Sequence, residues 1–291
     1  MANTPIKLND NTTIPLLAFG TGTALYGTDA EHLVTAAINA GFTHLDGAQA
    51  YKNEDSLGAG IVAAGKARKQ LFVTTKLAKQ PEDKSVRDSL VESLAKLQVD
   101  YVDLFLIHTP IYYQEPGRLK AVWRQVEAIK KEGLARSIGV SNFRPAQLRE
   151  ILDGAEFPPS VNQIEFHPYV YNDLLPTLEL QKQYGIVTES YGGLSPIFRF
   201  KGGPLDPVLT SIANRLSETT GKPFNEAEVL FLWQREKGVV IVTTTTKESR
   251  LAGYLSILDA PKLTDDEINL IDEAGAKEHH RHFVRVTILE D

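Results

Sequence analysis

The chain has 291 residues, 42% of them hydrophobic and 23% charged, which is ordinary for a soluble globular protein with a sizeable core. Its formal net charge of −6 gives no reason to expect nucleic acid or an anionic membrane as the main partner. The absence of cysteine excludes disulfides, thiolate metal sites and thiol nucleophiles. No apolar run approaches the ~18 residues of a membrane helix, and the N-terminus carries no signal-peptide pattern, so we expect a cytoplasmic protein.

Short apolar segments alternate with amphipathic helical patterns along the whole chain, without a linker rich in Pro, Gly or Ser. The expected strands are Leu16–Gly20, Phe42–Asp46, Leu71–Lys76, Val102–His108, Arg136–Val140, Val161–Ile164, Ile186–Glu189 and Val239–Val242. The expected helices lie near Ala30–Ala40, Asp55–Ala64, Ser85–Leu97, Leu119–Glu132, Pro145–Leu152, Leu174–Tyr184 and Glu226–Lys237. This alternation predicts an α/β fold, a (β/α)₈ TIM barrel formed by a single domain over residues 1–291.

Other segments are expected outside the barrel repeat. Near the N-terminus, Ile6–Leu8 and Thr12–Ile14 flank a polar turn, which predicts a β-hairpin at the barrel floor. An extra segment, Pro207–Thr219, precedes the seventh helix, and a capping box that begins at Thr264 predicts a last helix ending near Ala274.

A short tail follows and carries three histidines, at positions 279, 280 and 282. Without a partner at fixed spacing, we interpret them as a solvated polar tail rather than a metal site, and we expect no bound metal.

Three of the expected strands end in an acid–base group: Asp46, Lys76 and His108, with Tyr51 shortly after the first. Barrels of this type carry their chemistry at the carboxyl ends of the strands. Taken singly, these residues are ordinary: a helix cap, an interfacial tyrosine, a rim lysine and a histidine bonded to backbone. Together they form a coherent acid, because a tyrosine with pKa near ~10 donates a proton poorly unless a cation lowers that pKa.

In this hypothesis Lys76 supplies the cation, and Asp46 keeps the lysine charged and oriented. His108 donates a hydrogen bond to a substrate carbonyl oxygen while Tyr51 protonates that oxygen as hydride arrives at its carbon. A competing pattern, the Gly-Thr-Gly-Thr that begins at Gly20, resembles the start of a dinucleotide fingerprint. Leu25 occupies the place of the third glycine, so we reject a Rossmann fold.

These residues, and motifs that run from Gly20 to Leu251, resemble the aldo-keto reductase family. The motifs include Leu106-Ile107-His108, Ile138 to Phe143, Val161 to Tyr169 and Thr243 to Leu251. The resemblance implies a catalytic tetrad of Asp46, Tyr51, Lys76 and His108, and NADPH as cofactor. It further implies that Ser141, Asn142 and Gln163 hold the nicotinamide carboxamide, that Tyr191 stacks on the nicotinamide ring, and that Gly192, Gly193, Leu194 and Ser195 wrap the pyrophosphate. Gly22 and Thr23 complete the expected cofactor contacts.

The chain departs from the common family pattern at three places. Ala24 and Thr109 stand where many relatives carry Trp, so we expect a roomier substrate pocket, to which Leu25 and Tyr26 also belong. The Lys-Ser pair usual for the 2′-phosphate is replaced by Thr243, Thr244, Thr245 and Thr246, which leaves Arg250 and Lys247 as cations. The tail is short. These features most resemble the fungal branch that contains conjugated polyketone and ketopantoyl-lactone reductases.

The sequence therefore predicts NADPH-dependent reduction of aldehydes or ketones, with α-dicarbonyls and keto-lactones as favoured substrates. We expect a monomer, with a dimer as the alternative. One competing hypothesis is a Schiff-base aldolase that uses Lys76, which borohydride trapping without nicotinamide would reveal. Another is a redox-sensing, nicotinamide-binding subunit on the same fold, which a turnover assay would separate from an enzyme.

Overall fold

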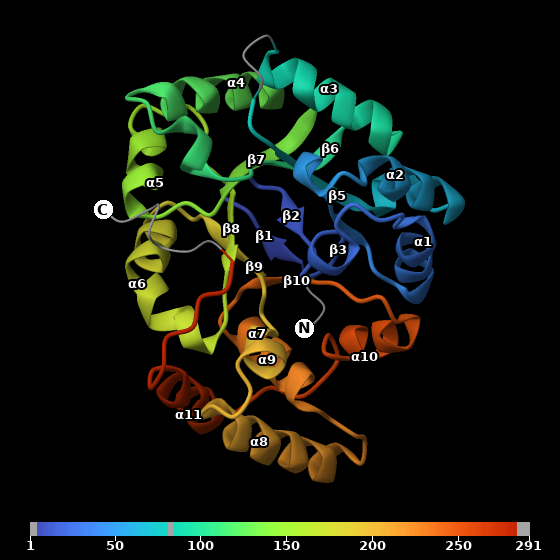
Figure 1. Cartoon of the computed structure of the whole chain (residues 1–291), viewed down its shortest axis with the longest axis vertical. Helices are drawn as coiled ribbons and strands as arrows, with labels where there is room; N and C mark the ends of the chain where they lie inside the picture. The colour runs from blue at the N-terminus through green and yellow to red at the C-terminus, as the bar shows by residue number, and fades with distance from the viewer. Residues whose placement is uncertain (1–4, 81–83, 284–291) are drawn as a thin grey trace.

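The computed structural model describes residues 5–80 and 84–283. Eight parallel strands close into a barrel in the order β10, β3, β4, β5, β6, β7, β8, β9, with helices packed around the outside (Figure 1). Their bounds are β3 Leu17–Gly20, β4 His44–Asp46, β5 Phe72–Leu77, β6 Val102–Ile107, β7 Ala135–Ser141, β8 Val161–Glu165, β9 Val187–Tyr191 and β10 Val240–Thr243. Each expected strand is present, so the predicted (β/α)₈ barrel is confirmed.

The helices of the outer ring follow the strands in chain order. They are α1 Glu31–Ala40, α2 Glu54–Ala63, α3 Val86–Leu97, α4 Arg118–Glu132, α5 Pro145–Leu152, α6 Pro168–Gln183, α9 Glu226–Glu236 and α10 Leu251–Ser256. Three more helices lie outside the repeat: α7 Ser195–Arg199, α8 Leu205–Thr220 and α11 Asp265–Gly275. Short 3₁₀ turns are η1 Thr23–Leu25, η2 Gln49–Tyr51, η3 Arg68–Gln70, η4 Pro110–Tyr113 and η5 Glu248–Arg250.

The predicted helices differ from the observed ones mainly at proline. Helix α6 begins at Pro168 rather than Leu174, because proline fits the first turn of a helix, and it continues through Pro176. Helices α7 and α10 are absent from the prediction, since five and six residues are too short for a periodic pattern. The capping box at Thr264 is confirmed, with the Thr264 side chain accepting from the backbone N–H of Glu267.

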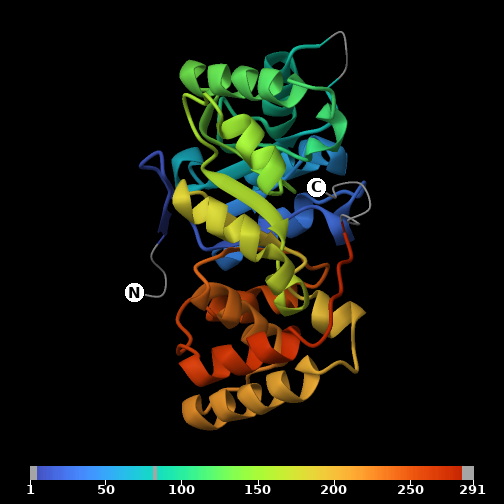
Figure 2. The same ribbon diagram turned by 90° about the vertical axis from the view of Figure 1, so that its left-hand side faces the viewer.

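The expected N-terminal hairpin is also confirmed. Strands β1 (Ile6–Lys7) and β2 (Thr13–Ile14) pair antiparallel. Leu8 and Ile14 are buried against Leu104, Val161 and Val240 inside the barrel, so apolar contacts seal this end. In Figure 2 the hairpin lies on one side and the red segment that ends at Phe283 on the other, so the two occupy opposite ends of the barrel.

Close packing of the outer ring depends on a glycine. A Cβ at Gly58 in α2 would meet the carbonyl oxygen of Lys96 and lie 2.7 Å from the carbonyl carbon of Leu97, at the end of α3. Glycine therefore lets α2 approach α3, and together the two helices cover the strands that carry the site.

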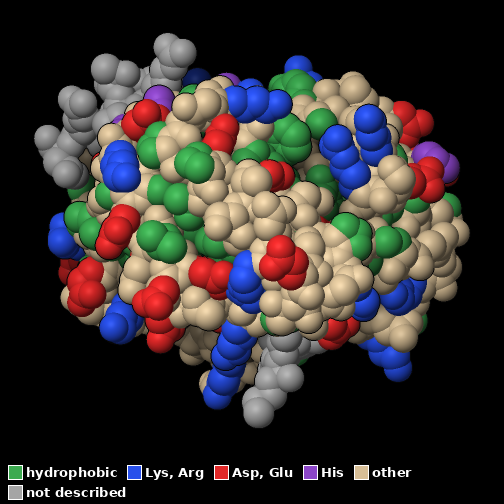
Figure 3. Space-filling model, turned by 90° about the horizontal axis from the view of Figure 1, so that it is seen from below, with side chains coloured by type: hydrophobic (Ala, Val, Ile, Leu, Met, Phe, Trp, Pro, Cys, Tyr) green, Lys and Arg blue, Asp and Glu red, His purple; other side chains and the backbone are tan. Residues whose placement is uncertain are grey.

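On the molecular face shown in Figure 3, Lys and Arg side chains are interspersed with Asp and Glu among the residues coloured by type. A search of the described helices found none long and apolar enough to cross a membrane.

Candidate active site

A buried lysine links three of the four expected catalytic residues at the carboxyl ends of neighbouring strands. Lys76 Nζ, on β5, donates to both carboxylate oxygens of Asp46, at 2.7 Å each, and to the carbonyl oxygen of Gly47 at 2.9 Å. It also donates to the hydroxyl oxygen of Tyr51 at 3.2 Å. Lys76 is fully buried and Asp46 is 1% exposed, so water does not screen this contact.

The charges of this group follow from its surroundings. Burial disfavours a charged lysine, but the Asp46 carboxylate and Tyr51 outweigh it and raise the pKa of Lys76 above its usual range. Burial likewise raises the pKa of Tyr51, and the opposing effect of Lys76 does not overcome it. The expectation that Lys76 makes this phenol more acidic than free tyrosine is thus wrong for the protein alone. The lysine still lies close enough to the hydroxyl to favour the charged form of the phenol over the neutral one.

His108 lies beside the phenol without a charge of its own. Its ring meets that of Tyr51 edge to face, with centroids 5.5 Å apart. Burial, helped by the nearby positive charge of Lys76, lowers the pKa of His108 to about 3. A neutral imidazole carries one N–H, which can donate to a carbonyl oxygen near the Tyr51 hydroxyl.

A second hydrogen-bond network joins the residues expected to hold a carboxamide. Tyr191 donates its hydroxyl to Asn142 Oδ1 at 2.5 Å. Asn142 Nδ2 donates to the His108 carbonyl oxygen at 2.9 Å and to Ser141 Oγ at 3.1 Å, and Ser141 Oγ donates to the Gln163 carbonyl oxygen at 2.7 Å. Asn142 adopts the left-handed conformation (φ 65°), which Asn tolerates better than most residues. Its amide thus serves mainly to hold the Tyr191 ring in place.

These groups border one cavity of about 760 Å³, a size suited to a large organic ligand. Seventeen of the residues predicted for the site line it. They are Gly22, Thr23, Tyr26, Asp46, Tyr51, His108, Ser141, Asn142, Gln163, Tyr191, Gly192, Gly193, Leu194, Ser195, Thr243, Thr244 and Arg250.

Six predicted site residues, all in the described part of the chain, do not line the cavity: Lys76, Ala24, Leu25, Thr109, Thr245 and Thr246. Lys76 lies behind the Tyr51 hydroxyl. Leu25 is 3% exposed and belongs to the hydrophobic core, and Thr109 Oγ1 caps η4 by accepting from Ile111 N. Thr245 Oγ1 accepts from Lys247 N at 3.0 Å and holds the turn before η5. The structure thus gives no support to a mouth widened at Ala24 and Thr109.

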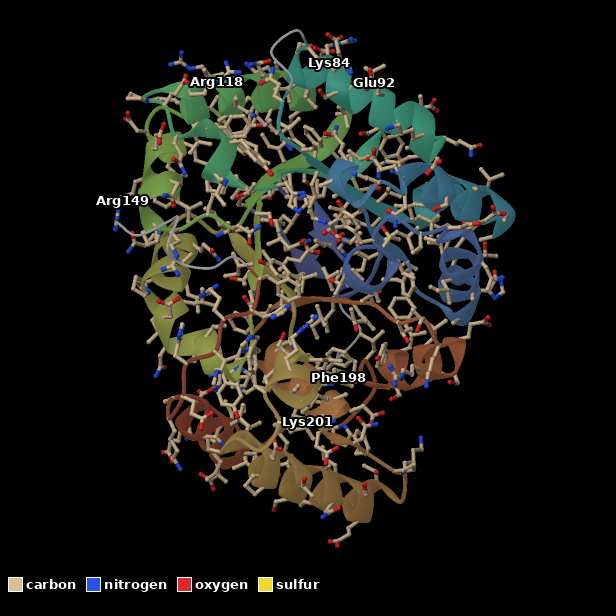
Figure 4. The ribbon with its side chains drawn as sticks, viewed as in Figure 1. Lys84, Glu92, Arg118, Arg149, Phe198 and Lys201 are labelled. Atoms are coloured by element: carbon tan, nitrogen blue, oxygen red, sulfur yellow. The ribbon has the colours of Figure 1, made fainter. Side chains whose placement is uncertain are left out.

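Several lining residues escaped the sequence analysis: Gly20, Phe198, Arg199, Phe231, Val242, Tyr254 and Phe283. Figure 4 shows Phe198 on helix α7, whereas Lys84 and Glu92 lie at the opposite edge of that view. Phe198 is 56% exposed and Tyr26 is 52% exposed, so aromatic rings flank the opening. Phe198 and Arg199 were missed because α7 is too short to predict.

The tail packs against the cavity through its backbone and Phe283, while His279 and His282 are exposed, as expected of a solvated polar tail. The backbone N–H groups of His282 and Phe283 donate to the two carboxylate oxygens of Glu165, at 2.9 and 3.1 Å. The Phe283 ring then meets the Tyr191 ring edge to face, 5.2 Å between centroids. Glu165 ends strand β8 and was a missed signal, since an acid at a strand end had already identified Asp46.

The cavity also suits a nicotinamide dinucleotide on structural grounds. Thr244 Oγ1, which lies at the cavity, is buried without a hydrogen-bond partner in the described structure, as expected of a group that awaits an acceptor or donor. A Cβ at Gly22 would lie 2.8 Å from the Tyr51 ring, so only glycine lets the backbone approach the phenol this closely at the cavity wall. Arg250 lines the cavity together with Thr243 and Thr244, and no described carboxylate forms an ion pair with it.

A parallel barrel with a buried lysine–carboxylate pair behind a tyrosine, beside a dinucleotide-sized cavity, defines a nicotinamide-dependent oxidoreductase. The model of the Aldo/keto reductase family matches residues 17–276, and the chain belongs to this family. It is an oxidoreductase that acts on carbonyl compounds with NAD(P)H.

Similar proteins of known name cover almost the whole chain. An NAD/NADP-dependent indole-3-acetaldehyde reductase of Schizosaccharomyces pombe is 35% identical, over 94% of this chain and 95% of that protein. The NADPH-dependent alpha-keto amide reductase of Saccharomyces cerevisiae is 33% identical, over 92% and 90%. An aldo-keto reductase of Bombyx mori, solved in complex with NADP, is 32% identical with a TM-score of 0.80, over 93% of this chain and 92% of that one.

The depressed pKa of His108 gives a testable pH dependence. Since the buried imidazole titrates near 3 rather than 6.5, its NMR signals should not move between about pH 5 and 8. An unfolded histidine takes up a proton as the pH drops below 6.5, and the folded one does not. The neutral His108 therefore stabilises the fold fully above that pH, and this contribution declines toward pH 3. His108→Gln should make this part of the urea-unfolding pH profile less steep, while the buried His44, whose pKa is also lowered to about 3, keeps its own share of the slope. A His108 midpoint near 6.5 would contradict the assignment.

Proposed function

We propose that this protein reduces activated aldehydes and ketones with NADPH, with Tyr51 as the general acid. NADPH, when bound, supplies the hydride. The protein holds the carbonyl oxygen between the Tyr51 hydroxyl and the His108 imidazole, and Tyr51 transfers its proton to that oxygen. Lys76 stabilises the resulting phenolate, and Asp46 keeps Lys76 charged and fixed in place.

One observation carries this proposal: Lys76 Nζ contacts the Asp46 carboxylate and the Tyr51 hydroxyl at once, at 2.7 and 3.2 Å. A cation that touches a phenol oxygen makes proton loss easier at the moment it is needed, while burial keeps the phenol protonated beforehand. The cavity is lined beside it by apolar side chains such as Leu194 and Phe231, which limit the water that reaches the reacting carbon.

The same geometry weighs against the two competing hypotheses. A Schiff-base lysine must lose its proton to attack a carbonyl, but the pKa of Lys76 is raised by Asp46 and Tyr51. Lys76 also does not line the cavity. A subunit that only senses nicotinamide would not need a phenol, an ammonium and an imidazole arranged around one oxygen position. The complete set favours an enzyme.

The preference for NADPH rests on Arg250, which lines the cavity at its Thr243–Thr244 end. A guanidinium can bind a 2′-phosphate through two parallel hydrogen bonds, and the threonine hydroxyls add neutral ones. Glu248, on the same turn, lies 2.6 Å from His32 on α1. Its carboxylate is thus engaged by His32, and the Arg250 side chain contacts the Tyr254 hydroxyl, a neutral partner that does not cancel its charge.

Activated carbonyl compounds are the proposed substrates. Relatives include a glyoxal reductase of Bacillus subtilis, 35% identical, and the alpha-keto amide reductase of Saccharomyces cerevisiae. Both names describe a carbonyl next to a second electron-withdrawing carbonyl, which makes the first more electrophilic. The aromatic opening formed by Tyr26 and Phe198 offers flat apolar surface to such compounds. A position near the fungal polyketone and ketopantoyl-lactone reductases is part of this proposal and rests on the segment Thr244 to Leu251 and the short tail.

Tyr51→Phe tests the mechanism. The substitution keeps the ring but removes the proton, so kcat should fall by at least ~10²–10⁴-fold while NADPH binding stays nearly intact. Single-turnover hydride transfer at saturating NADPH is the measurement. Tyr26→Phe, at the opening of the same cavity, is the matched control and should keep its rate. A rate for Tyr51→Phe close to that of the wild type would mean that another group protonates the product.

Arg250→Ala tests the cofactor preference. Loss of a charge-assisted contact worth ~1.5–3 kcal/mol should weaken NADPH binding roughly 10- to 150-fold and leave NADH binding almost unchanged. Fluorescence titration with both cofactors measures this. Lys247→Ala is the control, because Lys247 does not line the cavity, and it should change neither affinity much. Equal losses for NADPH and NADH in Arg250→Ala would place the guanidinium away from the phosphate.

The substrate class is tested by comparing kcat/KM for α-dicarbonyls, keto-lactones and simple aldehydes of similar size. The activated compounds should be reduced faster, because less of the barrier remains for the enzyme to lower. Phe198→Ala should weaken this preference by removing aromatic surface at the opening. A wild type that favours simple, unactivated aldehydes would refute the proposed class but not the carbonyl reduction.

A further inference from the structure

A buried glutamate that the proposed mechanism does not use lies directly beneath the site. Glu189, in strand β9, is fully buried, and its Oε2 accepts from Gln163 Nε2 at 2.8 Å. The same nitrogen donates to Asp46 Oδ2, also at 2.8 Å. Both hydrogens of the Gln163 amide are therefore committed to carboxyl groups on the inner side of the barrel.

This pairing leaves only one way for the Gln163 amide to face. Asp46 is ion-paired with Lys76, so it accepts hydrogen bonds and cannot donate to an amide oxygen. The nitrogen must then point inward, and Oε1, which accepts no hydrogen bond from the described residues, faces the cavity that Gln163 lines. The neighbouring amide nitrogen, Asn142 Nδ2, is also fully used, because it donates to the His108 carbonyl oxygen and to Ser141 Oγ.

The surroundings of the other carboxyl oxygen, Glu189 Oε1, indicate that this carboxyl group is neutral. No described group donates to Glu189 Oε1; the nearest basic atom, His44 Nε2, is 3.6 Å away and bonds to Thr74 Oγ1. Burial, together with the nearby Asp46 charge, raises the pKa of Glu189 well above its usual range. A protonated Glu189 can accept from Gln163 without placing a second negative charge beside Asp46.

We propose that Glu189 is a positioning residue that fixes the Gln163 amide with its carbonyl oxygen toward the cavity, so that this subsite accepts a hydrogen bond from the carboxamide NH₂ of the nicotinamide ring. The inference rests on the proposed use of NADPH. Without Glu189, one amide hydrogen of Gln163 loses its buried partner, and the amide is held only by its single hydrogen bond to Asp46, about which it can swing away from the cavity.

The experiment compares two nucleotides that differ in this one group. In the 3-acetylpyridine analogue of NADP⁺, a methyl group replaces the carboxamide NH₂ and cannot donate. Calorimetric titration of the purified protein should show the wild type binding NADP⁺ at least about fivefold more tightly than the analogue, because the analogue leaves Gln163 Oε1 without its partner. Glu189→Leu should bring this ratio to within about twofold of unity.

Two variants separate positioning from a general structural effect. Glu189→Gln keeps a neutral acceptor of the same shape and should retain the wild-type ratio. Glu54→Leu is the matched control: Glu54 is also a buried glutamate with a raised pKa, but it bonds to Thr75 and Ser93 and not to Gln163. It should cost stability and leave the ratio unchanged. An unchanged ratio in Glu189→Leu, or a ratio lost in Glu189→Gln, overturns the inference.

A measurement on the wild type keeps the inference testable if Glu189→Leu does not fold. Nitrogen-15 NMR should show both side-chain amide hydrogens of Gln163 protected from exchange with water, and exchange as fast as in an exposed glutamine would overturn it. The two proposals fail differently. A wild type that binds neither nucleotide disproves the cofactor use itself. A wild type that binds both equally overturns only the positioning role of Glu189.

Discussion

The site depends on one interaction, the buried ion pair between Lys76 and Asp46. Two charges in a dry interior are expensive to bury, and they persist here because Lys76 donates to both Asp46 oxygens and to the Gly47 carbonyl oxygen. Loss of either partner would leave an uncompensated buried charge, a change that typically costs ~3–5 kcal/mol. The ion pair therefore matters for the stability of the barrel as well as for the chemistry of the site.

The pair also orders its neighbours by leaving them only one chemically acceptable arrangement. Because Asp46 can only accept, Gln163 must present its nitrogen to it. Burial, and after it the charge of Lys76, keep the His108 imidazole neutral. Tyr191 is held by Asn142, whose amide is in turn held by backbone and Ser141. In this end of the barrel, each of these polar side chains is thus held in its orientation by hydrogen bonds to its neighbours. Such a network keeps the site rigid before any ligand binds.

The sequence predicted the barrel, and it pointed to four residues that the structure brings together, because both depend on local signals. Strand ends are marked by a change from apolar to polar residues, and Asp46, Lys76 and His108 all stand at such a change. The rest depends on contacts between distant segments. The local sequence around Phe283 does not show that its backbone N–H bonds to Glu165 and that its ring packs on Tyr191. In the same way, the sequence alone does not show that Leu25 is buried in the core and not in the pocket. The predicted lowering of the Tyr51 pKa was wrong for the same reason, because the burial that raises this pKa is a property of the whole fold.

Closure of the barrel joins the first barrel strand to the last, through the pairing of Phe19 in β3 with Thr243 in β10. The cavity spans this seam, with Gly20 and Gly22 on one side and Thr243 and Thr244 on the other. A ligand bound there contacts both edges and resists their separation, by ~2.7 kcal/mol at a hundredfold excess over its Kd. Hydrogen exchange along β3 and β10 would then slow when the cavity is filled, while the remaining strands keep their own rates. The ligand would then bridge the first and last strands of the barrel, which lie more than two hundred residues apart in the chain.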